Sequence, residues 1–312
     1  MKNKKGFEFS FGWLFAIIVG AAIIFLAIYA TSRFIQTERT VQDTKLGKQL
    51  GIILSPIETS LEEGKITTIS LPIETRIYND CDEKGNFGSQ KISTATKSAV
   101  GTEWQKPGFP SSFYNKYIFS EDVIEGNNFI VFSKPLEMPF KIADLIYIWQ
   151  DTNSYCFVNP PNEIEEEILS LQPSNINITQ NKCRNSINVC FNSPDPDCEI
   201  RISTEAKTVR REFQKTISYE TTPLLYAAIF STPEIYECQL KRLMKRASEL
   251  STLYQQKSFF LAQKSCSSNL ELELSLFAEQ TLSLNSSAQI TNIFQNSETI
   301  RRKNNELSCK LF

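Results

Sequence analysis

The chain has 312 residues, of which 33 are basic, 35 are acidic and none is histidine, so its formal net charge is −2. A hydrophobic content of 41% and a charged content of 22% are typical of a folded protein and exclude an intrinsically disordered one. The balanced charge gives no reason to expect nucleic acid as a partner.

A long apolar segment begins close to the start of the chain. Lys2, Lys4 and Lys5 precede residues 7–32, in which Glu8 is the only charged residue. A helix of about 20 apolar residues spans the hydrocarbon core of a bilayer. The segment is longer than the apolar core of a cleaved secretory signal, and no small-residue cleavage site follows it. The sequence therefore predicts one transmembrane helix over residues 7–32, which stays in the lipid bilayer.

Charge and sulfur both indicate which side of the membrane the rest of the chain occupies. The lysines before the span favour a cytoplasmic N-terminus by the positive-inside rule. All eight cysteines lie beyond the span, and an even number in an oxidising compartment indicates disulfides. A zinc site is the alternative, but the sequence has no histidine and no Cys-x-x-Cys pair. We therefore expect a single-pass protein of the cell membrane with an extracellular head. The expected disulfide cysteines are Cys81, Cys156, Cys183, Cys190, Cys198, Cys238, Cys266 and Cys309.

The start of the chain resembles a class III signal peptide. A basic leader, residues 1–6, ends in Lys4-Lys5-Gly6 and is followed by Phe7 and an uninterrupted apolar helix. Over about the first 35 residues this is similar to type IV pilin-like proteins, including archaeal pilins and archaellins. In that family a prepilin-type peptidase cuts after the glycine, and the helix anchors the subunit or packs in a filament core. The resemblance implies that Gly6 precedes the cut, that Phe7 is the mature N-terminus, and that this peptidase and other surface subunits are partners.

The chain departs from the family pattern at one position. Many bacterial members carry a glutamate as the fifth mature residue, where it meets the amino group of a neighbouring subunit. Here the fifth position is Phe11, and Glu8 is the second. The departure bears on filament assembly more than on processing. The alternative is an uncleaved signal anchor whose lysines serve only topology.

Apolar residues continue beyond the span at helical intervals. They are Phe34, Ile35, Val41, Leu46, Leu50, Ile53, Leu54 and Ile57. The pattern predicts a stalk helix over residues 33–63, continuous with the span, although Gly47 and Gly51 weaken it and Pro56 ends or kinks it. Such a helix either docks on a globular head, as in pilin-like subunits, or lifts the head flexibly off the membrane.

The region 64–204 is predicted to be a β-rich α+β head. Alternating residues in 66–78 indicate a half-buried strand, 82–88 a hairpin turn and 91–97 a second strand. Residues 104–117 form an aromatic loop, which we expect to cover a core rather than to bind a ligand.

Four short apolar runs follow, each of strand length. Continuous apolar runs indicate a sheet that is buried on both faces. The runs are residues 129–132, 145–149, 176–178 and 187–191.

Acidic residues gather at the start of one predicted helix. Asn162 is expected to be its N-cap and Glu165 to complete a capping box, with Glu163, Glu166 and Glu167 placed where the helix dipole favours acids. Paired carboxylates also serve glycoside hydrolysis. Because helix-start electrostatics explains every one of them, we assign no catalytic residue.

Two further motifs lie in the head. Asp195-Pro-Asp197, between Cys190 and Cys198, resembles a small calcium loop but lacks its glycine and distal glutamate, so we expect a turn clamped by a disulfide. Asn177 and Asn285 begin glycosylation sequons, which are compatible with an outward-facing head.

Residues 205–312 are predicted to form a helical bundle. Thr232 caps and Pro233 starts a helix that runs to about residue 263. A basic face opposite its apolar stripe is expected to be solvated, the alternatives being lipid headgroups or an acidic partner. This face comprises Lys241, Arg242, Lys245 and Arg246. Two more helices are expected near 270–284 and 288–310.

The helical order predicts one disulfide. If three consecutive helices alternate in direction, the end of the first and the end of the third lie at the same end of the bundle. This places Cys266 beside Cys309. We expect that bridge, with Cys183, Cys190 and Cys198 at least partly paired locally.

Missing residues and motifs bound the chemistry. Without histidine there is no Ser–His or Cys–His pair, no imidazole base and no His-ligated metal. The P-loop, Gly-x-Gly-x-x-Gly and Gly-x-Ser-x-Gly motifs are also absent. We expect no enzyme activity, no cofactor and no metal.

The sequence thus predicts an α+β protein with a transmembrane helix, a stalk, a disulfide-stapled extracellular head and a C-terminal helical bundle. Its leading interpretation is a pilin-like or pseudopilin-like structural or assembly subunit, similar to archaeal surface proteins. The alternative is a membrane-tethered binding or adhesion protein that does not polymerise, with an unknown external ligand. An extracellular hydrolase using two carboxylates is the least favoured hypothesis.

Overall fold

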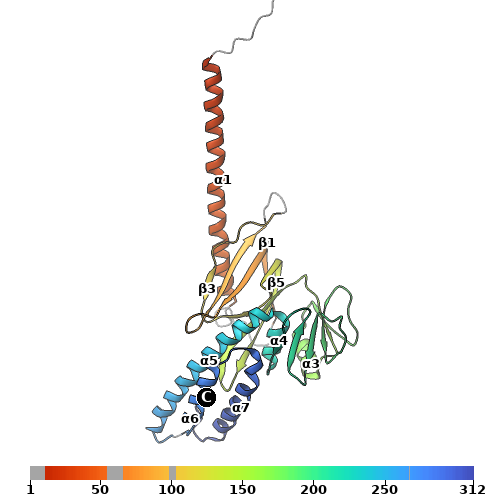
Figure 1. Cartoon of the computed structure of the whole chain (residues 1–312), viewed down its shortest axis with the longest axis vertical. Helices are drawn as coiled ribbons and strands as arrows, with labels where there is room; N and C mark the ends of the chain where they lie inside the picture. The colour runs from red at the N-terminus through yellow and green to blue at the C-terminus, as the bar shows by residue number, and fades with distance from the viewer. Residues whose placement is uncertain (1–10, 55–65, 98–102, 267) are drawn as a thin grey trace, which may run out of the picture.

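A long N-terminal helix, two six-stranded sheets and a group of C-terminal helices make up the structure, a computed structural model (Figure 1). It describes residues 11–54, 66–97, 103–266 and 268–312. The mixed α+β class expected from the sequence is confirmed.

Helix α1 is one uninterrupted element, Phe11–Ile53. Its 43 residues extend about 65 Å at 1.5 Å per residue. No proline interrupts it, so the predicted span and stalk form a single helix. The predicted break at Pro56 and the turn that follows it lie outside the described residues.

The first sheet has the strand order β3-β2-β1-β5-β6-β4. Its strands are β1 (Thr67–Asp82), β2 (Ser89–Thr96), β3 (Ser111–Phe113), β4 (Tyr117–Phe119), β5 (Val123–Glu137) and β6 (Lys141–Gln150). Neighbours are antiparallel except β4 and β6, which are parallel. The predicted hairpin is confirmed, because Asp82 and Ser89 pair at the turn between β1 and β2.

The second sheet has the order β12-β11-β10-β9-β7-β8. Its strands are β7 (Tyr155–Val158), β8 (Ile176–Thr179), β9 (Ile187–Phe191), β10 (Ile200–Ser203), β11 (Thr208–Arg211) and β12 (Ile217–Ser218). Strands β8, β7, β9 and β10 pair in parallel, and β11 and β12 complete the sheet in antiparallel. The sheet continues past residue 204, where the helical region was expected to begin.

The four predicted apolar runs are all strands, but they divide between the two sheets. Runs 129–132 and 145–149 pair in the first sheet, as parts of β5 and β6. Runs 176–178 and 187–191 flank β7 in the second. A single sheet was a wrong reading, because a continuous apolar run specifies burial but not a partner strand.

The C-terminal helices are α4 (Thr222–Phe230), α5 (Pro233–Ala262), α6 (Glu271–Leu282), the 3₁₀ turn η1 (Ser287–Gln289) and α7 (Ile290–Glu306). The predicted start of α5 is confirmed, since the Thr232 hydroxyl accepts a hydrogen bond from the Ile235 amide at 3.4 Å. Helix α4 is buried almost throughout, in keeping with its apolar sequence.

Helix α3 (Asn162–Leu171) begins one residue earlier than expected. Pro161 is its N-cap, no side chain caps it, and Asn162 is its first helical residue. Because proline has no amide hydrogen, the N-cap offers no donor for the side chain of a capping box, and no such box forms. Glu163 and Glu165 do lie in the first turn, as the helix dipole favours.

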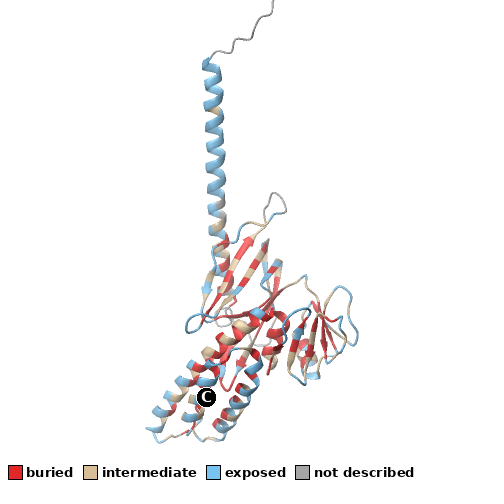
Figure 2. Ribbon diagram, in the orientation of Figure 1, coloured by how far each residue is buried: buried red, intermediate tan, exposed pale blue. Residues whose placement is uncertain are grey.

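The first sheet is covered on both faces (Figure 2). One face packs against the end of α1 through isoleucines, Phe129 and Val131. The other face of β5 and β6 meets α4 and the second sheet in a larger cluster rich in aromatic rings, where Trp149 stacks on Phe230 at 4.4 Å between ring centroids. The head therefore consists of layers packed on the two faces of this sheet, with α1 on one side and α4 and the second sheet on the other.

We predict that the head unfolds in alkali. Burial raises the pKa of Tyr147, Tyr155, Tyr226 and Tyr236 far above the ordinary value, and raises the pKa of Tyr219 to about 12. Above pH 10 an unfolded tyrosine loses its proton while the folded one keeps it, so unfolding releases protons. Each such tyrosine lowers the free energy of unfolding by about 1.4 kcal/mol per pH unit until its folded pKa is reached.

The measurement is denaturant unfolding of the full chain in micelles between pH 9 and pH 12 (about the range set by these pKa values), with tyrosinate absorbance as a second signal. The part of the tyrosinate absorbance that comes from the buried tyrosines should appear together with unfolding. Tyr155→Phe should reduce the number of protons released on unfolding by about one. Tyr114→Phe, at a side chain that is 66% exposed, should not change that number. Tyrosinate absorbance that Tyr155→Phe removes, if it forms near pH 10 in protein that is still folded, would contradict the prediction.

Candidate functional site

The last turns of α1 dock on the first sheet. Their buried residues, Asp43, Gly47, Leu50, Gly51 and Leu54, recur at the spacing of one helix face. The two leucines pack with apolar side chains from β1, β2, β4, β5 and β6. The stalk is therefore docked, which decides between the two arrangements that the sequence allowed.

Glycines bring the helix close to the head. A Cβ atom at Gly51 would fall on the ring of Phe113 in β3, and one at Gly108 would lie 2.6 Å from the Thr44 nitrogen. Gly47 also faces the sheet, with Ile92 O at 3.4 Å from such an atom. In the sequence Gly47 and Gly51 only weaken a helical pattern, whereas in the structure they create the contact surface.

Hydrogen bonds add to this contact. The Thr94 hydroxyl of β2 donates to the Asp43 carbonyl at 2.7 Å, and the Phe109 amide donates to the Thr44 hydroxyl at 3.0 Å. The aromatic loop thus holds α1 as well as covering the core. Its Phe109 and Tyr114 are 73% and 66% exposed, so these two rings do not contribute to the core that the loop was expected to cover.

The first part of α1 has the opposite character. Its large apolar side chains, from Phe11 at 83% exposed to Tyr29 at 51%, contact nothing in the head. The helix is long and apolar enough to cross a membrane, judged by length and composition. The expected processing residues, Gly6 and Phe7, lie outside the described part of the chain, as does Glu8.

All eight cysteines are paired. The bridges are Cys81–Cys238, Cys156–Cys183, Cys190–Cys198 and Cys266–Cys309. The last is the pairing that the helix order predicted, and Cys183, Cys190 and Cys198 have local partners, as expected. Cys81–Cys238 ties β1 to α5 across 157 residues, a separation from which no sequence rule gives the partner.

The expected solvation of the basic face of α5 is wrong for Arg242, and the other three residues are only partly exposed. Arg242 has no exposed surface. Its guanidinium donates to the carbonyls of Phe87, Phe113, Tyr114 and Lys116 and to the Gln239 side chain, at 2.7–3.4 Å. Burial lowers the pKa of Arg242 to about 10, so the side chain is still protonated at neutral pH and all its donors are present.

The other basic residues on this face are also engaged. Lys245 donates to the Glu83 and Gly85 carbonyls, and Arg246 donates to the Ile142 carbonyl at 2.7 Å. Lys241 pairs with Glu83 at 2.9 Å. These contacts hold α5 against the β1–β2 turn and the start of β6.

The acidic motifs have structural partners. Glu167 of α3 pairs with Lys134 and accepts a hydrogen bond from the Tyr226 hydroxyl at 2.9 Å. Lys182 reaches Asp195 at 2.8 Å and Asp197 at 3.7 Å, in the turn that the Cys190–Cys198 bridge closes. Within the described ranges, no three Cys, Asp or Glu side chains gather where they could hold a metal ion.

Two surface hollows lie among the residues that the structure describes. One, of about 350 Å³, lies among the C-terminal helices and is lined by Tyr254, Arg301 and Phe312, with Glu137 as its acidic side chain. The other, of about 500 Å³, lies on the second sheet and is lined by Arg201 and Arg210, with Glu205 as its acidic side chain. Asn177 and Asn285, which begin the sequons, are both exposed.

Comparison of the chain with protein-family models, with curated proteins and with solved structures finds no match.

We predict that Gly108→Ala loosens the docking of α1. The added methyl group would press on backbone atoms of Asp43 and Thr44, which cannot rotate away, and such overpacking costs about 1 to 3 kcal/mol. Gly20→Ala is the matched control, because nothing lies within 4 Å of its added atom. Spin labels at Thr37 and Ser112 should show a broader distance distribution for Gly108→Ala only. An unchanged distribution would contradict a docked stalk.

We also predict that Arg242→Met destabilises the head strongly. The change leaves buried carbonyls without donors and should lower the free energy of unfolding by about 3 to 5 kcal/mol. Arg302→Met, at an exposed position of α7, is the control and should change stability by less than about 0.5 kcal/mol. Denaturant unfolding in micelles measures both, and equal effects would refute the role given to Arg242.

Proposed function

We propose that this chain is a single-pass surface protein of the cell membrane that serves as a pilin-like or pseudopilin-like structural or assembly subunit. The continuity of α1 carries the proposal. The helix that exposes apolar side chains along its first part is docked on the head by its last turns. A force on the apolar part therefore reaches the head through a single helix.

The exposed part of α1 presents a long apolar surface. Side chains such as Phe11, Ile24 and Phe25 are more than half exposed along the helix. Exposure of so large an apolar surface to water is unfavourable, so another apolar surface must bury it. A lipid bilayer covers such a helix in a membrane-anchored subunit. Helices of other subunits cover it in a filament core.

The proposed topology places the N-terminus in the cytoplasm and the head outside. Three lysines before the span support this orientation. Four disulfides in the head support it independently, because disulfides persist in oxidising compartments. The resemblance of the leader to class III signals adds cleavage after Gly6 by a prepilin-type peptidase and assembly with other surface subunits.

A tethered binding protein that does not polymerise is the second candidate. The polar hollow on the second sheet favours it, since that hollow lies away from the surface where α1 docks. The carboxylate-dependent hydrolase has less support. Each of the two hollows is lined by one acidic side chain, whereas glycoside hydrolysis uses two.

The test begins with N-terminal sequencing of the protein extracted from membranes. We expect the mature chain to start at Phe7, and Gly6→Val to leave the leader in place because the peptidase would no longer cut. Gly20→Ala is the control and should be processed normally. Protease added to intact cells should digest the head, as expected for an extracellular domain.

Electron microscopy of sheared surface material separates the two candidates. Filaments or multisubunit assemblies containing the processed chain would support the subunit function. Processed protein that remains a monomer in the membrane would favour the tethered binding protein. An intact leader together with the absence of any assembly would refute the pilin-like proposal.

A further inference from the structure

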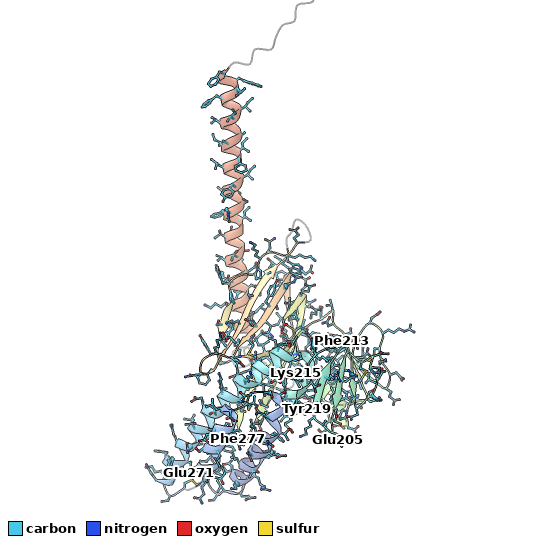
Figure 3. The ribbon with its side chains drawn as sticks, in the orientation of Figure 1. Glu205, Phe213, Lys215, Tyr219, Glu271 and Phe277 are labelled. Carbon is cyan, nitrogen blue, oxygen red and sulfur yellow. A yellow bond between two sulfur atoms is a disulfide. The ribbon has the colours of Figure 1, made fainter. Side chains whose placement is uncertain are left out.

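The second sheet has one buried face and one face that is only partly covered. Ile200, Ile202 and Val209 point into the large core. On the opposite face, the Cys156–Cys183 and Cys190–Cys198 bridges cover β7 and β9. The outward face of β10 and β11 stays open. The two ends of this sheet are marked by Glu205 and Phe213 in Figure 3.

Two arginines lie side by side on this open face. Arg201 of β10 and Arg210 of β11 are direct cross-strand partners, so their side chains project from the same face. Like charges placed directly opposite one another destabilise a sheet. In the part of the chain that the structure describes, neither guanidinium forms an ion pair with a carboxylate. The Arg201 Nε atom is buried and has no hydrogen-bond partner there.

In the described residues, no nearby carboxylate lies within ion-pair distance of either guanidinium. Glu199 and Glu212 lie one residue pair further along the same face, and the Glu199 carboxylate accepts a hydrogen bond from the Asn188 amide at 2.9 Å. Asp195 and Asp197, in the adjoining loop, are engaged by Lys182. Glu205 lines the hollow without contacting either arginine at ion-pair distance. The two guanidinium groups therefore face the hollow without a direct ion-pair contact, although three carboxylates lie in the neighbourhood.

The rest of the lining supplies neutral hydrogen-bonding groups. Ser203 and Thr208 are cross-strand partners beside the arginines, Thr216 precedes β12, and Asn192 and Ser193 form the wall next to the Cys190–Cys198 turn. The Asn192 side chain is hydrogen-bonded to Thr204, whereas the Ser193 and Ser203 hydroxyls accept from backbone amides and can still donate. The volume of about 500 Å³ suits a ligand of small-molecule size.

We propose that this hollow binds an acidic sugar. The guanidinium groups of Arg201 and Arg210 take the carboxylate, since the arginine fork matches the two oxygens of that group. The hydroxyl groups of the lining take the sugar hydroxyls. A bound carboxylate also removes the repulsion between the two arginines. This inference does not depend on polymerisation, because binding is a property of the head of one subunit.

The test is calorimetric titration of the full chain, in micelles of an uncharged detergent, with digalacturonic acid. Galactobiose, its neutral counterpart, and inorganic sulfate are titrated in parallel. We expect binding of digalacturonic acid that weakens as salt is raised. Arg201→Gln and Arg210→Gln should each weaken it by about tenfold or more. Arg302→Gln, on exposed α7, should leave it unchanged.

Stability distinguishes a binding role from a structural one. If the arginines serve a ligand, the Arg201→Gln/Arg210→Gln double variant loses binding and melts at the same or a higher temperature, because a like-charge pair has been removed. A lower melting temperature would indicate a structural role and overturn the proposal. Equal affinity for galactobiose, for sulfate alone, or of the double variant for digalacturonic acid would overturn it as well.

Discussion

The arrangement of the head depends on one buried cation. Arg242 of α5 has no exposed surface and no carboxylate among its hydrogen-bond partners, so backbone carbonyls and the Gln239 side chain satisfy its donors. Those carbonyls come from the β1–β2 turn, the end of β3 and the approach to β4. Because a buried charge without partners costs several kcal/mol, these three segments are fixed relative to α5. The Cys81–Cys238 bridge, one helical turn away, ties the same helix to the end of β1.

This constraint extends to the anchor through Phe113. Its carbonyl accepts a hydrogen bond from Arg242 at 3.4 Å, and its ring occupies the space left by Gly51 of α1. Phe113 therefore touches both α1, the candidate membrane helix, and α5, the long helix of the C-terminal group. Since close-packed contacts have few alternative arrangements, the two long helices are connected through the first sheet as one unit.

Local patterns in the sequence were sufficient for many elements. The alternation of apolar and polar residues predicted β1, and the cap at Thr232 predicted the start of α5. The order of three helices predicted the Cys266–Cys309 pair. Features that depend on distant segments were not accessible. The charge of Arg242 indicated a solvated side chain because the carbonyls that accept its hydrogen bonds lie more than 100 residues away in sequence. The partner of Cys81 is equally distant. The glycine spacing in α1, every fourth residue on the buried stripe, was the one local signal of docking that could have been used.

The two proposed activities use surfaces that do not compete. Helix α1 packs on one face of the first sheet, whereas the second sheet joins the core on the opposite face (Figure 1). Covering the apolar part of α1, by lipid or by neighbouring helices, therefore leaves β10 and β11 open. The unpaired arginines on those strands repel each other whether the chain is alone or assembled, so selection for stability alone would favour a neutral pair at these positions. Their presence on a face that anchoring leaves free is consistent with a head that binds while its helix holds it in place.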